Sequence, residues 1–130
     1  MGNNPIKGSE AKVILFRNYE ESVVIRNTNG KPNDFGHSIE MNNNSIFISS
    51  PMDTLGGSVH IYDIHGIFIT QISGKDVAPL VKPNAEFGSS ITFLTNNLLL
   101  IGAKNNGPSG INKLIQIYSL LIINLILTHR

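Results

Sequence analysis

The chain has 130 residues, of which 41% are hydrophobic and 15% are charged, and its net charge is +1 at pH 7. This length and hydrophobic content are enough for one domain with a packed core, which excludes a disordered chain. The nearly neutral balance excludes the extended basic surface that nucleic-acid binding requires. Because the sequence has no cysteine, disulfides, thiolate metal sites and thiol nucleophiles are also excluded.

Targeting and membrane signals are weak. Residues 1–10 form a polar N-terminal tail without the apolar core of a secretory signal. The most apolar run, residues 120–127, is interrupted by Asn124, whereas a helix that crosses a bilayer needs about 20 apolar residues. This run predicts a buried strand and no membrane span. The sequence leaves the cellular compartment undetermined.

Short apolar runs rich in Ile and Val, separated by Gly, Asn, Pro and Ser, predict strands throughout the chain. Residues 11–16 and 22–26 are expected to form a first hairpin around a polar turn. A matching pair of strands recurs twice. The second hairpin comprises residues 57–62 and 67–72 joined by 63–66, and the third comprises residues 113–118 and 120–127.

Two more pairs of short strands lie between the hairpins. Residues 37–41 and 45–49 are joined across the asparagines 42–44, and residues 89–94 and 98–101 are joined across residues 95–97. Asparagine tolerates the left-handed backbone region, which suits a tight reversal. The chain is therefore predicted to be all-β. It would hold half a unit in residues 11–34, a four-stranded antiparallel unit in 35–86 and another in 87–130.

The two full units have similar amino-acid sequences. Phe35-Gly36 corresponds to Phe87-Gly88, and Tyr62 corresponds to Tyr118, with an offset that grows from 52 to 56 residues. Such drifting self-similarity indicates one supersecondary unit used repeatedly, with insertions in loops. Tandem four-stranded units form either a propeller or a stacked solenoid. Residues 46–48, apolar on both faces, favour an incomplete β-propeller of about two and a half blades.

Catalytic patterns are missing from the sequence. The four histidines lack metal-ligand spacing, and no nucleophile elbow, phosphate loop or dinucleotide fingerprint occurs. His60 and Tyr62 share a strand face beside Asp63, but their alternation with Val59 and Ile61 predicts an exposed face near the rim of a sheet rather than an acid/base pair. We therefore expect no enzyme activity, no cofactor and no metal site.

The repeated pattern Phe-Gly-x-Ser-Ile, a polar turn, an apolar strand and a small-residue pair resembles the FG-GAP repeat, the blade unit of integrin α-subunit heads. Its Phe-Gly is matched by Phe35-Gly36 and Phe87-Gly88, and its Gly-Ala-Pro by Ser49-Ser50-Pro51 and Gly102-Ala103-Lys104. The resemblance covers residues 35–118, and residues 11–26 through the hairpin alone. It implies a propeller, a Phe ring wedged between blades, and cell-surface or extracellular adhesion.

Calcium-binding members of that family carry a loop of alternating Asp and Asn between the first two strands, because the cation needs six to eight oxygen ligands. The corresponding loops here, residues 42–44 and 95–97, are short and contain no carboxylate. We expect them to be turns without calcium.

The expected function is that of a non-catalytic binding, adhesion or scaffold module that uses loops between the sheets. Its partner would be a protein or a surface glycan, and the exposed sheet edges of an unclosed ring would favour self-association. A hydrolase or lyase on a propeller, with His37 and Glu40 on a first strand, and a truncated remnant without function stay open as alternatives. The candidate binding residues are Asp53, Thr54, Lys75, Asp76, Asn105 and Asn106.

Overall fold

The computed structural model describes residues 11–27, 34–77, 84–95, 98–105 and 114–119. Strands make up most of these residues, and the only helical element among them is the short 3-10 helix η2 (Gly74–Val77). The predicted all-β class is therefore confirmed. The strands are β1 (Lys12–Arg17), β2 (Glu20–Arg26), β3 (Ile39–Met41), β4 (Ser45–Ser50), β5 (Ser58–Asp63), β6 (Phe68–Ser73), β7 (Phe87–Thr95), β8 (Leu98–Ala103) and β9 (Leu114–Ser119).

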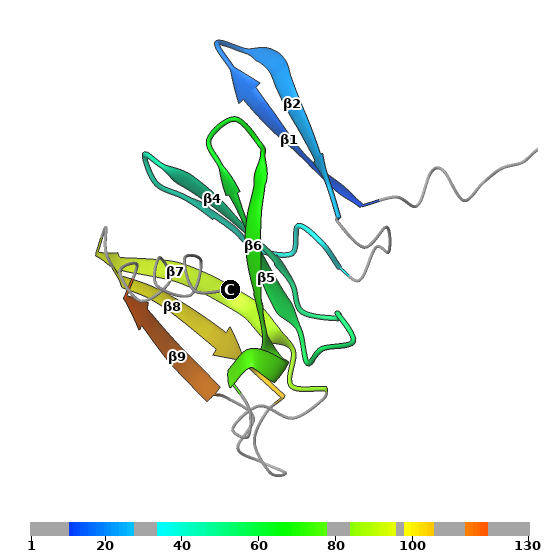
Figure 1. Ribbon diagram of the computed structural model, residues 1–130, viewed down its shortest axis with the longest axis vertical. Helices are drawn as coiled ribbons and strands as arrows, with labels where there is room; N and C mark the ends of the chain where they lie inside the picture. The colour runs from blue at the N-terminus through cyan, green and yellow to red at the C-terminus, as the bar shows by residue number, and fades with distance from the viewer. Residues whose placement is uncertain (1–10, 28–33, 78–83, 96–97, 106–113, 120–130) are drawn as a thin grey trace, which may run out of the picture.

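The strands form three separate sheets in chain order (Figure 1). β1 and β2 make a hairpin, β3 to β6 make a four-stranded sheet, and β7 to β9 make a three-stranded sheet, with neighbours in sequence as neighbours in space. All pairs within the sheets are antiparallel, as predicted. The described strands do not close into a ring. The strand predicted for residues 120–127 lies outside the described residues.

The four-stranded and three-stranded sheets repeat the same register. Ile39 pairs with Ile48 in the first of them, and Ile91 pairs with Ile101 in the second. One strand further on, Ile46 pairs with Tyr62, and Leu99 pairs with Tyr118. Residues that correspond in sequence therefore occupy corresponding positions in the two sheets, and the self-similarity reflects a repeated structural unit.

Two apolar clusters hold the sheets together, one on each face of the four-stranded sheet. The first lies between this sheet and the hairpin, and the second lies between this sheet and the three-stranded sheet. The first cluster contains Ile25, Phe35, Ile46, Ile48 and Tyr62, with Ala11, Val13, Leu15 and Val23 packed against it. The second contains Phe47, Val59, Ile61, Ile72, Ala85, Phe87, Ile91, Leu99, Ile101 and Ala103.

The expectation that His60 and Tyr62 lie on an exposed face was wrong. Both are buried, with His60 at 0% and Tyr62 at 2% exposure. Successive residues of a strand point to opposite faces, so β5 contributes Val59 and Ile61 to one cluster and His60 and Tyr62 to the other face. The alternation of apolar and polar residues suggested one solvated face, but the hairpin covers that face.

The two Phe-Gly pairs lie in two turns that have the same conformation. The residue before each phenylalanine has a positive φ, 61° at Asp34 and 59° at Glu86, and the glycines follow at 94° and 96°. The backbone N–H of His37 donates to the carbonyl of Asp34 over 3.0 Å, and the backbone N–H of Ser89 donates to the carbonyl of Glu86 over 2.9 Å. Each turn directs its phenylalanine ring into the cluster shared with the preceding sheet.

The loop at residues 42–44 is a tight reversal. The side-chain oxygen Oδ1 of Asn42 accepts hydrogen bonds from the backbone N–H groups of Asn44 and Ser45, both over 2.8 Å. Asn42 N–H in turn donates to the Ser45 carbonyl over 3.1 Å. The asparagine side chain thus supplies the local hydrogen bonds that a turn between β3 and β4 requires. Two residues of the corresponding loop, 96–97, are outside the described part of the chain.

Candidate functional site

Three chain segments from the two repeated units meet at one end of the sheets. They are the loop 51–57 between β4 and β5, residues 84–86 before β7, and residues 104–105 after β8. Phe87 N–H donates to the Gly56 carbonyl over 2.8 Å, and Asn105 N–H donates to the Ala85 carbonyl over 3.0 Å. These backbone hydrogen bonds fix the three segments relative to one another.

Gly57 makes this approach possible. It has a φ of +93° and forms a parallel bridge with Phe87. A Cβ atom at this position would lie 2.2 Å from the Phe87 carbonyl oxygen and 2.4 Å from its nitrogen. Only a residue without a Cβ lets the two backbones run so close. The loop end therefore depends on a glycine in one unit and a phenylalanine in the next.

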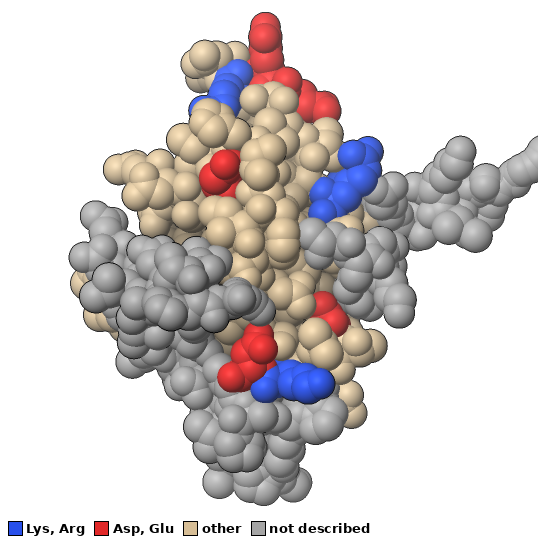
Figure 2. Space-filling view, in the orientation of Figure 1, with Lys and Arg blue, Asp and Glu red and all other residues tan. Residues whose placement is uncertain are grey.

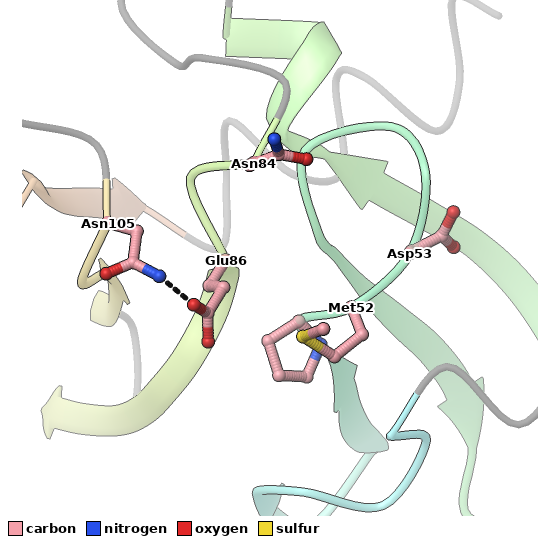
Figure 3. A pocket seen from close by; sticks show the side chains of 6 residues that line it. Met52, Asp53, Asn84, Glu86 and Asn105 are labelled. Atoms are coloured by element: carbon pink, nitrogen blue, oxygen red, sulfur yellow. Dashed lines mark hydrogen bonds between the residues drawn. The ribbon is translucent and has the colours of Figure 1, made fainter.

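The three segments enclose a pocket of about 150 Å³, shown in Figure 3. Pro51 and Met52 form its apolar side, and Met52 is well exposed. Polar groups come from the opposite segments (Figure 3). The complete lining consists of Pro51, Met52, Asp53, Asn84, Glu86 and Asn105.

The charge of Glu86 is already partly compensated. Its Oε1 lies 3.5 Å from the ammonium nitrogen of Lys104, and its Oε2 accepts a hydrogen bond from the side-chain amide of Asn105 (Figure 3). Two amides therefore line the pocket beside a carboxylate that has a lysine partner. Amides donate and accept hydrogen bonds at the same site, which suits ligand groups that also do both, such as hydroxyls.

Asp53 lines the pocket, but its carboxylate is directed elsewhere. The residue is 5% exposed, and its Oδ2 accepts a hydrogen bond from the Ser58 hydroxyl over 2.9 Å. In Figure 3 its carboxylate points away from Glu86 and Asn105. The backbone N–H of Gly57 donates to the Asp53 carbonyl over 3.0 Å. Asp53 therefore shapes the loop from inside and offers the pocket little polar surface.

Ser58 also connects Asp53 to His60. The Ser58 hydroxyl lies 3.1 Å from Nε2 of His60, and both residues are fully buried. Burial lowers the pKa of His60, and the negative charge of Asp53 offsets part of that decrease. The order differs from a catalytic triad, in which the histidine sits between serine and carboxylate. Here the serine is in the middle and its hydroxyl donates to the carboxylate, so nothing activates it as a nucleophile.

The other candidate binding residues lie near this end of the molecule. Thr54 is exposed on the same loop as Asp53. Lys75 is exposed on η2, and its N–H donates to the Leu55 carbonyl over 2.9 Å. The carboxylate of Asp76 accepts from the N–H of Ser73 over 2.8 Å. Asn106 lies outside the described residues, so the structure brings together Asp53 and Asn105 but leaves this candidate open.

His37 and Glu40, the residues considered for an enzyme, do not form a site together. Nδ1 of His37 lies 2.8 Å from the carboxylate of Asp34, and Nε2 lies 3.1 Å from the Ser89 carbonyl oxygen of the next unit. His37 thus links consecutive units at their surface. Glu40 is half-buried on β3.

Asn84 and Glu86 were not predicted as binding residues, because they lie in a segment that was interpreted as a linker. A signal was present, because an acidic residue, Asp34 or Glu86, precedes each Phe-Gly pair. An acid at a repeated position beside a repeated motif points to a shared local role. In the structure Asp34 and Glu86 both adopt the left-handed conformation at the start of the Phe-Gly turn.

The surface itself suggests no single charged partner. Figure 2 shows acidic and basic side chains scattered over one face of the molecule. In the described ranges, no helix has the length and apolar character needed to cross a membrane. Among the same residues, no group of three His, Asp or Glu side chains is arranged to hold a metal ion.

Comparison with known proteins does not assign the site. The resemblance to the FG-GAP repeat stays a prediction from the repeated sequence pattern. A scan against protein-family models gave no match, and a search of curated proteins gave none either.

Proposed function

We propose that the chain is a non-catalytic binding module and that its ligand binds in the pocket between the two repeated units. One observation supports this most directly. Loop segments from both units converge there and place two amides and a lysine-paired carboxylate beside an apolar side. Binding sites commonly combine apolar lining with a few converging polar groups. The backbone hydrogen bonds from Phe87 to Gly56 and from Asn105 to Ala85 would hold the lining segments in place for a ligand.

The chemistry of the lining favours a hydroxyl-rich ligand, a surface glycan. Glu86 already has Lys104 as a partner, so the site offers a cation little uncompensated charge. An anion would meet the Glu86 carboxylate. Sugar hydroxyls, by contrast, can donate to Glu86 and both accept from and donate to Asn84 and Asn105. The exposed Met52 side chain gives the apolar face of a sugar ring a surface to pack on.

Enzyme activity is the weaker alternative. A hydrolase or lyase needs a general acid or base with an adjusted pKa that can reach a substrate. His60 has a lowered pKa but is fully buried, and the hydroxyl of its neighbour Ser58 donates a hydrogen bond to the Asp53 carboxylate. In the described part of the chain, the Glu86 carboxylate contacts Lys104 and Asn105, and neither of them is a histidine or a second carboxylate.

We also propose that the sheets are successive blades of a propeller. The matching registers, the two identical Phe-Gly turns and the stacking of the sheets in chain order support this architecture. Exposed apolar residues on the outer face of the hairpin, Ile14 and Phe16, would then be covered by a neighbouring unit. Light scattering with size exclusion tests the related prediction of self-association, and a stable monomer at all concentrations would contradict it.

The binding proposal is tested by NMR titration of the full chain with mannose, galactose and N-acetylglucosamine. At least one of these sugars should shift the side-chain amide signals of Asn84 and Asn105 in a saturable way. Asn105→Ala should weaken that binding about two- to tenfold, because Asn105 is exposed and a hydrogen bond from its amide contributes about 0.5–1.5 kcal/mol.

Thr54→Ala is the matched control, because Thr54 is exposed on the same loop but does not line the pocket. This variant should bind as the wild type does. If no sugar shifts the pocket amides at millimolar concentration, or if Thr54→Ala and Asn105→Ala lose binding equally, the pocket is not a glycan site.

A further inference from the structure

His60 is an unusual residue to find in the interior of this molecule. It is 0% exposed, and its ring packs edge-on against Phe35, with the ring centroids 5.3 Å apart. Phe35 belongs to the cluster that joins the hairpin to the four-stranded sheet. His60 therefore lies beneath the contact between two successive units, and its state of protonation bears on that contact.

The hydrogen bonds fix which nitrogen of the neutral ring carries the proton. The single hydroxyl proton of Ser58 is donated to Asp53, so the contact between Ser58 and Nε2 requires a proton on Nε2. The lone pair of the neutral ring is then on Nδ1. This nitrogen is buried and has no hydrogen-bond partner among the described residues.

Protonation would place a new N–H donor, and a positive charge, at Nδ1. The described residues offer that donor no acceptor, and burying an unpaired charge is strongly unfavourable. Within the described part of the chain, Asp53 is the one charged group that acts on His60, and it lies on the Nε2 side, behind Ser58. It therefore cannot accept the Nδ1 proton.

The described residues around His60 supply no second carboxylate. The residues that the hairpin and β4 contribute to this face are apolar, β6 carries no charged residue, and the residue paired with His60 on β6 is Gln71. On the turn, Asp34 is paired with His37. On β5, Tyr62 stays neutral because burial raises its pKa to about 12, and the Asp63 carboxylate accepts from its own turn. The charged residues of the hairpin are all exposed: Lys12, Arg17, Glu20, Glu21 and Arg26.

We propose that protonation of His60 loosens the packing of the Phe35 turn and of hairpin β1–β2 on the four-stranded sheet, so that this contact between units weakens in acid. The closed state excludes the proton, whereas an opened state accepts it at the ordinary pKa of about 6.5. The opened state therefore binds more protons, and the closed state loses stability as the pH falls below that value. Gly36, which follows Phe35, faces Val13 of β1, so a displaced turn also disturbs the hairpin.

Hydrogen exchange of the β1 and β2 amides in the full chain tests whether acid weakens the packing of the hairpin. After correction for the intrinsic exchange rate, the opening equilibrium of the hairpin should rise up to about tenfold between pH 7.5 and pH 5.5. In His60→Gln it should stay constant. Glutamine is the matched replacement, because Gln116 occupies the corresponding position of the second repeat and does not titrate.

His37→Gln is a second control, because it removes the histidine that is adjacent to the Phe35 turn at the surface. This variant should keep the acid-dependent opening. An equal acid response in wild type and His60→Gln, or no response in the wild type, would overturn the proposal.

A measurement on the wild type alone covers the case in which His60→Gln does not fold. The imidazole nitrogen chemical shifts of His60 should show the neutral ring with the proton on Nε2 at pH 5.5 in the closed state. A ring that becomes fully charged with an ordinary midpoint while the hairpin stays protected would refute the proposal.

Discussion

Replacing Phe87 by alanine removes the largest fully buried side chain that β7 contributes to the contact between the four-stranded and three-stranded sheets. The residue is 0% exposed and belongs to a cluster with Val59, Ile61 and Leu99. Its backbone is held by Gly56 and lies against Gly57, so the main chain cannot move inward to fill the space. A buried Phe→Ala change in such a place costs about 3–5 kcal/mol.

This loss would be a large part of the stability of a small domain, which is typically about 5–15 kcal/mol. Urea unfolding followed by circular dichroism measures it, with the slope of the transition compared between variants. Phe35→Ala should lose a similar amount, because Phe35 is 6% exposed in the corresponding turn. Phe16→Ala is the control, because Phe16 is 59% exposed, and it should change the stability by less than about 0.5 kcal/mol.

A cost below about 1 kcal/mol for Phe87→Ala would refute the reasoning, since the ring would then not be buried between the sheets. Should this variant fail to fold, Phe87→Leu, which keeps most of the apolar volume, should show a smaller loss in the same direction. Equal effects of Phe16→Ala and Phe87→Ala would likewise contradict the assignment of inner and outer faces.

Four further substitutions test the glycine turns, the buried Tyr62 and the turn that follows β5. Gly36→Ala should cost about 1–2 kcal/mol for its positive φ. Gly57→Ala has the same backbone strain but also places a Cβ 2.2 Å from a carbonyl oxygen, so its loss in urea unfolding should be clearly larger, and equal losses would count against the close approach. Burial raises the pKa of Tyr62 to about 12, so stability present below pH 10 should fall by up to about 3 kcal/mol as the pH rises to 12, and Tyr62→Phe should lack this loss. Hydrogen bonding from Ile67 N–H, over 2.9 Å, lowers the pKa of Asp63, so its contribution, present above the ordinary value of 3.8, is lost in acid. Asp63→Ala should therefore lose less stability than the wild type between pH 5 and pH 3, and an identical acid profile would exclude this role.

Most of the strands could be predicted because their signals are local. Runs of Ile and Val between turn residues gave each described strand to within about two residues, and the two Phe-Gly pairs showed that a unit is repeated. Local patterns also predicted the reversal at Asn42, because an asparagine side chain can complete a turn on its own.

The faces of β5 could not be predicted in the same way. His60 and Tyr62 alternate with Val59 and Ile61 as in a strand with one solvated face, yet the hairpin covers that side. Whether a strand is buried on both faces depends on how the sheets stack. His60 can be buried because Ser58 forms a hydrogen bond with its Nε2. The sequence of one strand contains no information about the sheet that lies on it.

The pocket was also beyond prediction from local pattern. Asp53 and Asn105 were both candidates, but their common position depends on how loop 51–57 meets the next unit. Which of them presents polar atoms to the pocket depends on Ser58, whose hydroxyl holds the Asp53 carboxylate. Glu86 was missed because residues 75–86 were interpreted as a linker, although Asp34 holds the corresponding position before the other Phe-Gly pair.

The central claim is that each Phe-Gly turn places its ring between one sheet and the sheet before it. Nuclear Overhauser contacts from the ring protons measure this directly in the full chain. The account predicts cross-peaks from Phe87 to methyl groups of Val59, Ile61 or Ile72 in the four-stranded sheet, and from Phe35 to Val13, Leu15 or Ile25 in the hairpin. Cross-peaks from both rings to residues of their own sheets alone would contradict it.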